Sequence, residues 1–356
     1  MKINVTKTYL PPYEEFESYL KKIWSDGQIT NQGKLVREFD DTLRTRLGLT
    51  NAQFVSNGTL ALQLAIRAFD LEGSEIITTP FTYVATTSAI MWEHCTPVFV
   101  DIDPVTLCLD PSKIEAAITP KTKAIMPVHV FGNMCDVEAI AEIAERHDLK
   151  VVYDAAHAFG VRHKDKSAFA YGDISICSFH ATKLFHTIEG GLVVSSSEEV
   201  DSKVELMKRF GHTGDEHHML GINAKASEFQ AAMGLVNLKH IDEIIEKLRK
   251  TSEMYDAHLP RETLQPVRPR EDIEHNYAYY PIVFNSEEAL KQAFKKLADY
   301  DIFPRRYFYP SLNTLPYLSS TQKCPVAEDI ALRSACLPLY ADIDESVIKK
   351  ICEVLS

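Results

Sequence analysis

The chain has 356 residues, with 38 Lys and Arg against 50 Asp and Glu, and so carries a formal net charge of −12. This acidic balance argues against a nucleic-acid-binding protein, because binding to a polyanion depends on clustered Lys and Arg that release counterions. With 45% hydrophobic and 25% charged residues, the composition is typical of a soluble globular protein, and the length favours two domains over one.

No apolar run reaches the length of about 18 residues that crosses a bilayer, and the first segment lacks the basic-then-apolar layout of a signal peptide. We therefore expect a cytoplasmic protein without a membrane partner. Seven cysteines occur without a C-x-x-C pair, which favours reduced core thiols over a disulfide framework or a zinc site. His217 and His218 lie on one loop without a second set of ligands, so no metal site is predicted.

The first fifty residues favour helices. An amphipathic helix is predicted over residues 13–24, closed by the turn Ser25-Asp26-Gly27. A polar stretch, GQITNQG, then leads to a second helix through residues 36–39.

From Phe54 onward, short apolar runs alternate with helical periods, which is typical of α/β architecture. Helices are predicted at residues 59–69 and 137–147. Because crossover helices join parallel strands, we expect one large, mostly parallel sheet. Its six candidate buried strands lie near Ile76, Phe99 and Ile125 and begin at Val151, Ile174 and Leu192.

After Leu238 the pattern changes to a charged helix at residues 240–259 and a Pro- and Arg-rich turn, PVRPRED. A strand at residues 277–284 and a helix at 286–301 follow. The predicted fold class is α/β, with a large sheet domain at residues 1–245 and a smaller C-terminal α+β domain at 246–356.

A polar turn, Ser56-Asn57-Gly58-Thr59, opens the helix predicted at residues 59–69. Gly58 and Thr59 at a helix start offer free N–H groups, a hydroxyl and the positive end of the helix dipole to a phosphate. Ser, Asn and Thr also cap helices that bind nothing, and taken alone this turn favours the capping interpretation.

Two charged residues follow predicted strands. Asp154 ends an apolar strand, where ligands bind in open α/β sheets, although a helix N-cap explains it equally well. Lys183 follows the strand that begins at Ile174, and a lysine against an apolar strand can lose its proton and form a Schiff base, whereas most lysines are surface charges. Gly190 and Gly191 permit close backbone packing beside it.

The order of these features is more specific than any one of them. Pyridoxal 5'-phosphate (PLP) needs a site for its phosphate, a carboxylate that keeps its pyridine nitrogen protonated, and a lysine that forms the imine. The turn at Gly58, Asp154 and Lys183 supply these in chain order. We therefore predict PLP as the cofactor.

A series of segments in chain order also carries a family resemblance: GQITNQG, FVSNGTLALQLA, TTPFTYVATTSAI, PVFVDIDPVT, KTKAIMPVHVFGNMCDVEAI, VVYDAAHAFG, CSFHATKLFHTIEGG, GINAKASEFQAAMG and RSACLPLYADI. Over nearly its whole length the chain resembles the nucleotide-sugar aminotransferases of the DegT/DnrJ/StrS type. The resemblance implies the PLP-dependent transferase fold type I, which is aspartate aminotransferase-like, and a homodimer with active sites at the subunit interface.

The resemblance also assigns roles by position. It makes Lys183 the catalytic lysine that binds the cofactor and later moves the proton between substrate and cofactor, and it pairs Asp154 with the pyridine nitrogen. His157 would lie near the ring hydroxyl, and Tyr83 would stack on the ring. The implied phosphate-binding residues are Gly58, Thr59 and Ser178, together with Asn223 of the neighbouring subunit.

Two segments depart from the family pattern. Asn223-Ala224-Lys225 occurs where Asn-x-Arg is common, and lysine keeps the charge without the bidentate fork of arginine. The run RRYFYP at residues 305–310 also differs from the usual segment, and we expect this region to help bind the sugar. The candidate substrate-binding residues are Lys225, Arg305, Arg306 and Tyr309.

Lys183 favours amino transfer, because family members that dehydrate sugars have a His in its place. The segments around Lys183 and Asn223 most resemble the VioA-type branch. Such enzymes convert dTDP-4-keto-6-deoxy-D-glucose to dTDP-4-amino-4,6-dideoxy-D-glucose, with L-glutamate as amino donor, for O-antigen or other deoxyaminosugar biosynthesis. A 3-ketosugar substrate is the main alternative.

Two other classes of protein fit the sequence less well. A NAD-dependent sugar dehydrogenase would also be α/β and acidic, but no G-x-G-x-x-G follows a predicted strand. A non-catalytic PLP-binding regulator is disfavoured because Lys183 and Asp154 are both present.

Overall fold

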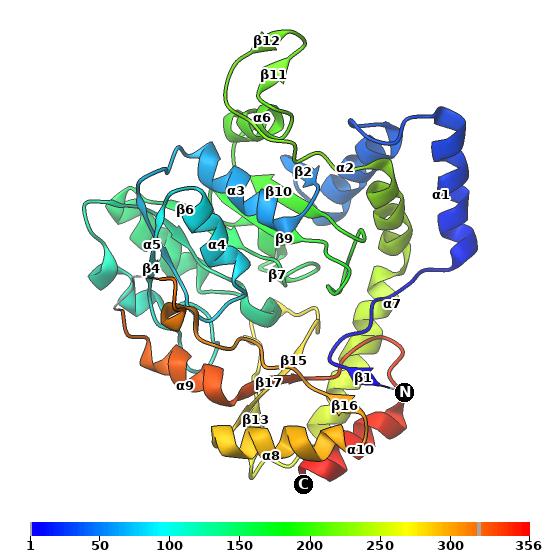
Figure 1. Ribbon diagram of the computed structural model, residues 1–356, viewed down its shortest axis with the longest axis vertical. Coiled ribbons are helices and arrows are strands. Elements are labelled where there is room, and N and C mark those ends of the chain that lie inside the picture. The colour runs from blue at the N-terminus through cyan, green and yellow to red at the C-terminus, as the bar shows by residue number, and fades with distance from the viewer. Residues whose placement is uncertain (1, 319–321) are drawn as a thin grey trace.

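A seven-stranded sheet forms the centre of the computed structural model, which describes residues 2–318 and 322–356 (Figure 1). The strand order is β2-β10-β9-β6-β5-β3-β4. The strands are β2 (Ala52–Val55), β3 (Glu75–Thr78), β4 (Thr96–Phe99), β5 (Thr122–Met126), β6 (Lys150–Asp154), β9 (Ile174–Ser178) and β10 (Gly191–Ser195).

Most neighbouring strands of this sheet are parallel. The pairs β3–β4, β3–β5, β5–β6 and β6–β9 are parallel, whereas β10 runs antiparallel to both β2 and β9. The expected large, mostly parallel sheet is confirmed. The expectation of six strands was wrong, because β2 is only four residues long and contains the polar Gln53, whose amide donates to the carbonyl of Asp201.

Helices cover both faces of the sheet, and this explains why its strands are buried and mostly apolar. The side chains of Val151 and Tyr153 in β6 join one core, and the intervening Val152 joins the other. The first core includes α2 (Lys34–Leu47), α5 (Val137–His147) and the start of α7 (Glu228–His258). The second includes α3 (Gly58–Ala68), α4 (Ala85–Trp92) and α6 (Glu198–Met207). Successive side chains of a strand point to opposite faces, so both sets are buried.

The helix α7 connects the sheet region to a C-terminal α+β part (Figure 1). It begins at Glu228, twelve residues before the predicted start, because Ser227 and Gln230 form a capping box. The C-terminal part has an antiparallel sheet of β13 (Leu264–Pro266), β15 (Tyr280–Phe284) and β17 (Ser334–Leu337). Its helices are α8 (Glu287–Ala298), α9 (Pro325–Arg333) and α10 (Glu345–Leu355).

The predicted division at residue 245 falls inside α7, not in a linker. Ile241 belongs to the core under the sheet, whereas Ile244 and Leu248 belong to a third core formed with α8 and α10. The division into two domains near residue 245 therefore remains a proposal, and α7 would run continuously through both domains.

The remaining elements lie at the periphery. The helix α1 (Tyr13–Asp26) packs beside α7, and the hairpin of β11 (His212–Thr213) and β12 (Glu216–His217) projects from the sheet region (Figure 1). The other short strands are β1 (Ile3–Asn4), β7 (Arg162–His163), β8 (Lys166–Ser167), β14 (Ile273–Glu274) and β16 (Ile302–Phe303). Short 3₁₀ helices span Pro111–Lys113, Glu115–Ala117, Val130–Gly132, Ala168–Ala170 and Leu312–Thr314.

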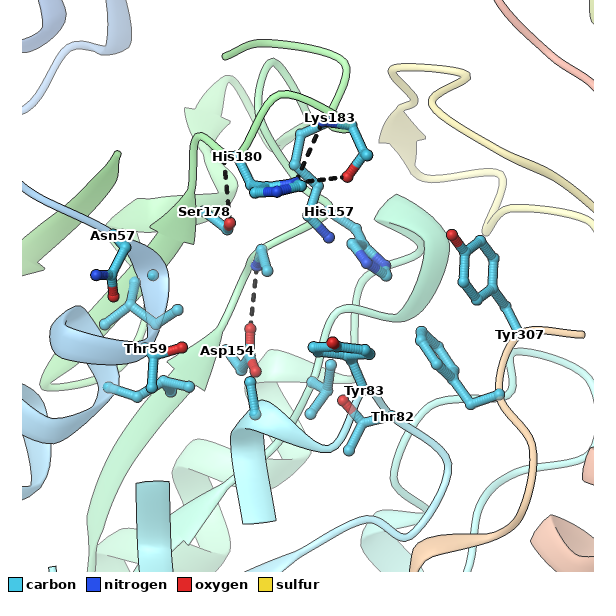
Figure 2. A pocket seen from close by; sticks show the side chains of 18 of the residues that line it. Asn57, Thr59, Thr82, Tyr83, Asp154, His157, Ser178, His180, Lys183 and Tyr307 are labelled. Atoms are coloured by element: carbon cyan, nitrogen blue, oxygen red, sulfur yellow. Dashed lines mark hydrogen bonds between the residues drawn. The ribbon is translucent and has the colours of Figure 1, made fainter. Parts of the chain in front are cut away.

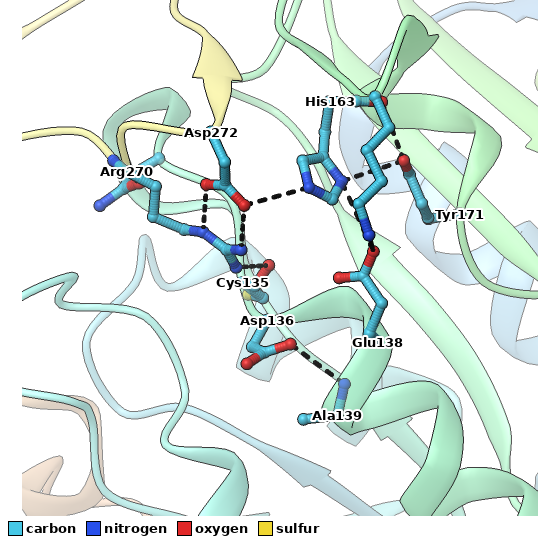
Figure 3. Close-up of polar contacts among 10 residues, drawn as sticks. Cys135, Asp136, Glu138, Ala139, His163, Tyr171, Arg270 and Asp272 are labelled. Atoms are coloured by element: carbon cyan, nitrogen blue, oxygen red, sulfur yellow. Dashed lines mark hydrogen bonds and ion pairs between the residues drawn. The ribbon is translucent and has the colours of Figure 1, made fainter.

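A polar network fastens the segment after α7 to the sheet region (Figure 3). Arg270 donates to the carboxylate of Asp272 at 2.6 Å and to the carbonyl of Cys135 at 3.1 Å. The buried imidazole of His163 bridges Asp272 and the hydroxyl of Tyr171, each at 3.1 Å. Hydrogen bonding to Arg270 lowers the pKa of Asp272 to about 2, so this carboxylate stays charged. The network fixes the chain just before Tyr279, which lines the cavity described below.

All seven cysteines are buried and have free thiols. Among the described residues, no helix combines the length and the apolar character that a membrane span requires.

Candidate active site

A cavity of about 290 Å³ opens at the carboxyl ends of β5, β6 and β9, where ligands bind in open α/β sheets (Figure 2). Its wall combines the start of α3, the loop before α4, the ends of these strands and the segment around Arg305. Of the predicted site residues, the cavity brings together Gly58, Thr59, Tyr83, Asp154, His157, Ser178, Lys183 and Arg305.

The N-terminus of α3 lines one end of the cavity, where Asn57, Gly58 and Thr59 lie. Asn57 caps the helix, and its side-chain oxygen accepts from the N–H of Leu60 at 2.8 Å. The capping interpretation is therefore right for Asn57. The first N–H groups of a helix lack intrahelical partners, and within the described ranges no protein acceptor bonds those of Gly58 and Thr59. With the hydroxyl of Ser178 on the same wall, these donors can hold a phosphate.

Close backbone packing makes this end possible. A Cβ on Gly58 would lie 2.9 Å from the Cβ of Ser178, and a Cβ on Gly191 would lie 2.6 Å from the carbonyl oxygen of Asn57. Both contacts are closer than real Cβ atoms allow. Of the paired glycines, Gly191 thus lets β10 lie directly against the turn that opens α3, whereas a Cβ on Gly190 would meet Thr187 and Phe54.

We expect Gly191→Ala to displace this turn, to lower the free energy of unfolding by about 1–3 kcal/mol and to weaken cofactor binding. The matched control is Gly27→Ala. A Cβ at Gly27 meets nothing within 4 Å, but its φ of +70° also makes the change costly, at about 1–2 kcal/mol. Urea unfolding and PLP titration of both variants test the expectation. Equal PLP affinity in the two variants would contradict it.

Asp154 lies at the end of β6, on the floor of the cavity (Figure 2). It caps no helix: one carboxylate oxygen accepts from the N–H of Ala156 at 3.1 Å and the other from the hydroxyl of Thr86 at 2.7 Å. Burial raises the pKa of Asp154, while these two hydrogen bonds and the charge of Lys183 lower it. An oriented, buried carboxylate can pair with a cationic ring nitrogen.

Lys183 follows β9 and extends into the same cavity (Figure 2). Within the described residues its ammonium has no carboxylate within ion-pair distance and no hydrogen-bond acceptor. Burial lowers the pKa of Lys183, and the nearby carboxylate of Asp154 opposes that shift. A lysine with a lowered pKa loses its proton more readily and becomes a better nucleophile and base.

His157 faces the cavity with one nitrogen already engaged. Its Nδ1 accepts from the backbone N–H of Phe131 at 3.1 Å. Burial lowers the pKa of His157 well below its usual value, so the ring is neutral and its proton lies on Nε2. The ring lies nearly parallel to the rings of Phe131 and Phe308, at interplanar angles of 9° and 10°, and the ring centres of these two residues lie 5.6 Å apart. The Nε2–H group can therefore donate to an oxygen in the cavity.

Several lining residues were missed from the sequence: Thr82, His180, Glu189 and Tyr279. Thr82 belongs to TTPFTYVATTSAI, but its hydroxyl carries no distinctive spacing. Tyr307 and Phe308, which belong to the run RRYFYP at residues 305–310, also line the cavity. In the sequence, Tyr279 was recognisable only as part of a predicted strand. Its place in the cavity depends on the long-range contacts of Asp272, which no local pattern reveals.

The structure places the other predicted residues outside the cavity. Asn223 forms an isolated antiparallel β-bridge with Arg209, and the Nζ of Lys225 lies 4.9 Å from the ring centre of Phe210. The guanidinium of Arg306 donates to Glu287 at 3.1 Å and to the carbonyl of Leu332 at 2.6 Å, and it covers the half-exposed ring of Tyr309. Arg306 and Tyr309 therefore belong to a separate surface cluster.

These residues fit PLP by their own chemistry. The cavity offers N–H donors at a helix start and a lysine that have no partners among the residues described, together with an oriented carboxylate. These groups match the phosphate, the aldehyde and the ring nitrogen of the cofactor. Together with the fold type I sheet, they define the class of PLP-dependent enzymes.

Comparisons with known proteins agree. The chain belongs to the DegT/DnrJ/EryC1/StrS aminotransferase family, whose sequence profile matches residues 13–356. The dTDP-4-amino-4,6-dideoxy-D-glucose transaminase of Shigella dysenteriae is 42% identical, over 99% of this chain and 98% of its own. The structure of DesI in the presence of its TDP-sugar product superposes with a TM-score of 0.95 at 30% identity, covering 99% of this chain and 92% of that chain. NtdA of Bacillus subtilis, solved with bound cofactor PMP, gives 0.88 at 27% identity, covering 96% and 81%. The protein is a PLP-dependent aminotransferase.

Proposed function

We propose that this aminotransferase moves the amino group of L-glutamate to the keto carbon of dTDP-4-keto-6-deoxy-D-glucose. The products are 2-oxoglutarate and dTDP-4-amino-4,6-dideoxy-D-glucose. The observation that carries the substrate is the 42% identity to the Shigella dysenteriae transaminase of that name, which extends through the cavity-forming segments and nearly the full length of both chains.

We assign cofactor-binding roles by position in the cavity. Gly58, Thr59 and Ser178 would hold the phosphate at the start of α3. Asp154 would pair with the ring nitrogen, His157 would donate to the ring oxygen, and Tyr83 would cover the ring. The support is that each group lies on the wall of one cavity with a hydrogen-bonding capacity that matches the assigned atom.

When bound, the cofactor supplies the electron sink that permits an amino group to leave one carbon and join another. The chain supplies the proton transfers. Lys183 Nζ is the group that would take the proton from the α-carbon of glutamate and later deliver a proton to the sugar carbon. Burial suits it to this role, because it lowers the pKa of Lys183.

The subunit arrangement is also a proposal. We propose a homodimer in which Asn223 of the neighbouring subunit completes the phosphate site, with Lys225 beside it. The support is that Asn223 and Lys225 lie near the projecting β11–β12 hairpin, where Phe210 and Leu220 are exposed. A cytoplasmic site of action and a role in O-antigen or other deoxyaminosugar biosynthesis follow from the proposed substrate.

Incubation with glutamate and then with dTDP-4-keto-6-deoxy-D-glucose tests the substrate. The visible absorbance of the lysine-bound cofactor should fade with glutamate and return with the ketosugar, and NMR of the product should show an amino group on C4. Absorbance that stays low means another ketosugar, and a 3-amino product establishes the 3-ketosugar alternative.

Arg305 and Arg306 provide a matched pair of variants. The guanidinium of Arg305 lines the cavity and has no carboxylate partner among the described residues, whereas Arg306 is paired with Glu287. We expect Arg305→Gln to raise KM for the nucleotide sugar about tenfold, because a charge-assisted hydrogen bond to an anionic group is lost. Steady-state kinetics should show an unchanged KM in Arg306→Gln, and a larger effect there would reverse the two assignments.

A further inference from the structure

A chain of hydroxyl groups connects the cavity wall to the carboxylate of Asp154. Thr82 lines the cavity beside Tyr83 and is buried (Figure 2). Its hydroxyl oxygen lies 3.0 Å from that of Thr86, and the hydroxyl of Thr86 lies 2.7 Å from Oδ2 of Asp154. Thr86 is fully buried in the first turn of α4 and does not line the cavity.

The direction of these hydrogen bonds follows from the charge of Asp154. An ionised carboxylate can only accept, so the single O–H of Thr86 must donate to Asp154. The oxygen of Thr86 then accepts from Thr82, whose O–H is directed away from the cavity. Both donors are polarised toward the carboxylate, and such chains strengthen each member.

We propose that Thr86, supported by Thr82, is a positioning residue for the reaction, which keeps the carboxylate of Asp154 charged and oriented toward the ring nitrogen of the cofactor. With Ala156 N–H on Oδ1 and Thr86 on Oδ2, neither oxygen of Asp154 can rotate freely. The remaining lone pairs of the carboxylate are left for the ring nitrogen.

The local backbone supports this role. The N–H of Thr86 donates to the carbonyl of Tyr83 at 3.2 Å, so the turn that places Tyr83 on the cavity wall also places Thr86 behind Asp154. The other ionisable groups that act on Asp154 are Lys183 and the Cys177 thiol, both from the segment that begins with β9. Burial raises the pKa of Asp154, and the hydrogen bond from Thr86 is the largest influence that opposes this shift.

Thr87 gives a matched control on the same helix. It is as fully buried as Thr86, but its hydroxyl has no hydrogen-bond partner among the described residues. Replacing either threonine with valine removes one hydroxyl and keeps the shape of the side chain. Only the change at position 86 removes a hydrogen bond from Asp154.

The test compares Thr86→Val, Thr86→Ser and Thr87→Val with the unchanged holoenzyme. Each protein is stripped of cofactor and titrated with PLP, and the pH dependence of the bound cofactor's absorbance is recorded. We expect Thr86→Val to raise the dissociation constant of PLP about tenfold, as for a lost hydrogen bond to a charged group. The pyridine nitrogen of PLP bound to this variant should lose its proton at a lower pH than in the unchanged protein. Thr86→Ser should restore both readouts, and Thr87→Val should change neither.

Unchanged PLP affinity and an unchanged pH profile in folded Thr86→Val would overturn the inference, and so would equal losses in Thr87→Val. If Thr86→Val does not fold, Thr82→Val provides the test. We then expect a smaller loss of PLP affinity than for a direct partner of Asp154. PLP affinity and a pH profile equal to those of the unchanged protein would contradict the proposal. The inference rests on the cofactor and not on the sugar. Failure of the unchanged protein to bind PLP would contradict the cofactor assignment itself, which is a distinct result.

Discussion

Replacing Lys183 with alanine should reduce the rate of amino transfer from glutamate by about 10²- to 10⁴-fold, the range associated with a positioned general base. Lys183 is the one lysine that lines the cavity in the described part of the chain, and burial lowers its pKa, so no nearby amine can replace it. Single-turnover absorbance with glutamate measures the effect. Lys183→Arg should be equally inactive, because an arginine stays protonated.

The stability of the apoprotein separates this effect from misfolding. Lys183 is buried without an ion pair, so the folded state bears the cost of desolvating its charge. We expect urea unfolding to give Lys183→Ala a free energy of unfolding at least equal to that of the unchanged protein. A large loss of stability, or activity within tenfold of normal, would show that Lys183 acts mainly as a structural residue.

Replacing Asp154 with asparagine should weaken PLP binding and slow the glutamate half-reaction by about 10²- to 10³-fold, the usual effect of removing one preorganised electrostatic group. The asparagine keeps the size of the side chain and can still accept from Ala156 N–H, but it cannot balance a positive charge on the ring nitrogen. PLP titration and single-turnover kinetics measure the two effects.

Asp173→Asn is the matched control for this change. Asp173 is a partly buried carboxylate that accepts from the N–H of Val151 at 2.8 Å, and it lies outside the cavity. The Asp173→Asn protein should have a lower free energy of unfolding and an unchanged affinity for PLP. Equal loss of PLP affinity in both variants would assign the effect of Asp154→Asn to the sheet and not to the cofactor.

The apoprotein of Asp154→Asn should also respond differently to pH. Burial raises the pKa of Asp154 in the folded state above that of the unfolded chain. The stabilisation that this group contributes is then fully present below the unfolded pKa and is lost as the pH rises through the folded pKa. Near neutral pH, Asp154→Asn apoprotein should therefore be at least as stable as the unchanged apoprotein. A marked loss there would mean that the charged carboxylate stabilises the fold.

The sequence by itself determined the elements whose patterns are local. The strands around Ile76, Ile125 and Val151 carry contiguous apolar residues, and α5 occupies residues 137–147 as predicted because its apolar period and its Asp136 cap are both local signals. The sequence also revealed the turn at Gly58, Asp154 and Lys183 in this chain order, because each adjoins a predicted helix or strand. From these residues the cofactor could be predicted.

Only the tertiary structure decided which side chains reach the cavity. Arg305 and Arg306 are neighbours in the sequence, yet one lines the cavity and the other pairs with Glu287 on α8. Thr86 and Thr87 are equally buried, yet only Thr86 meets Asp154, because consecutive helical residues point about 100° apart. The physical reason is that these roles depend on partners far away in the chain, brought together by packing on both faces of the sheet.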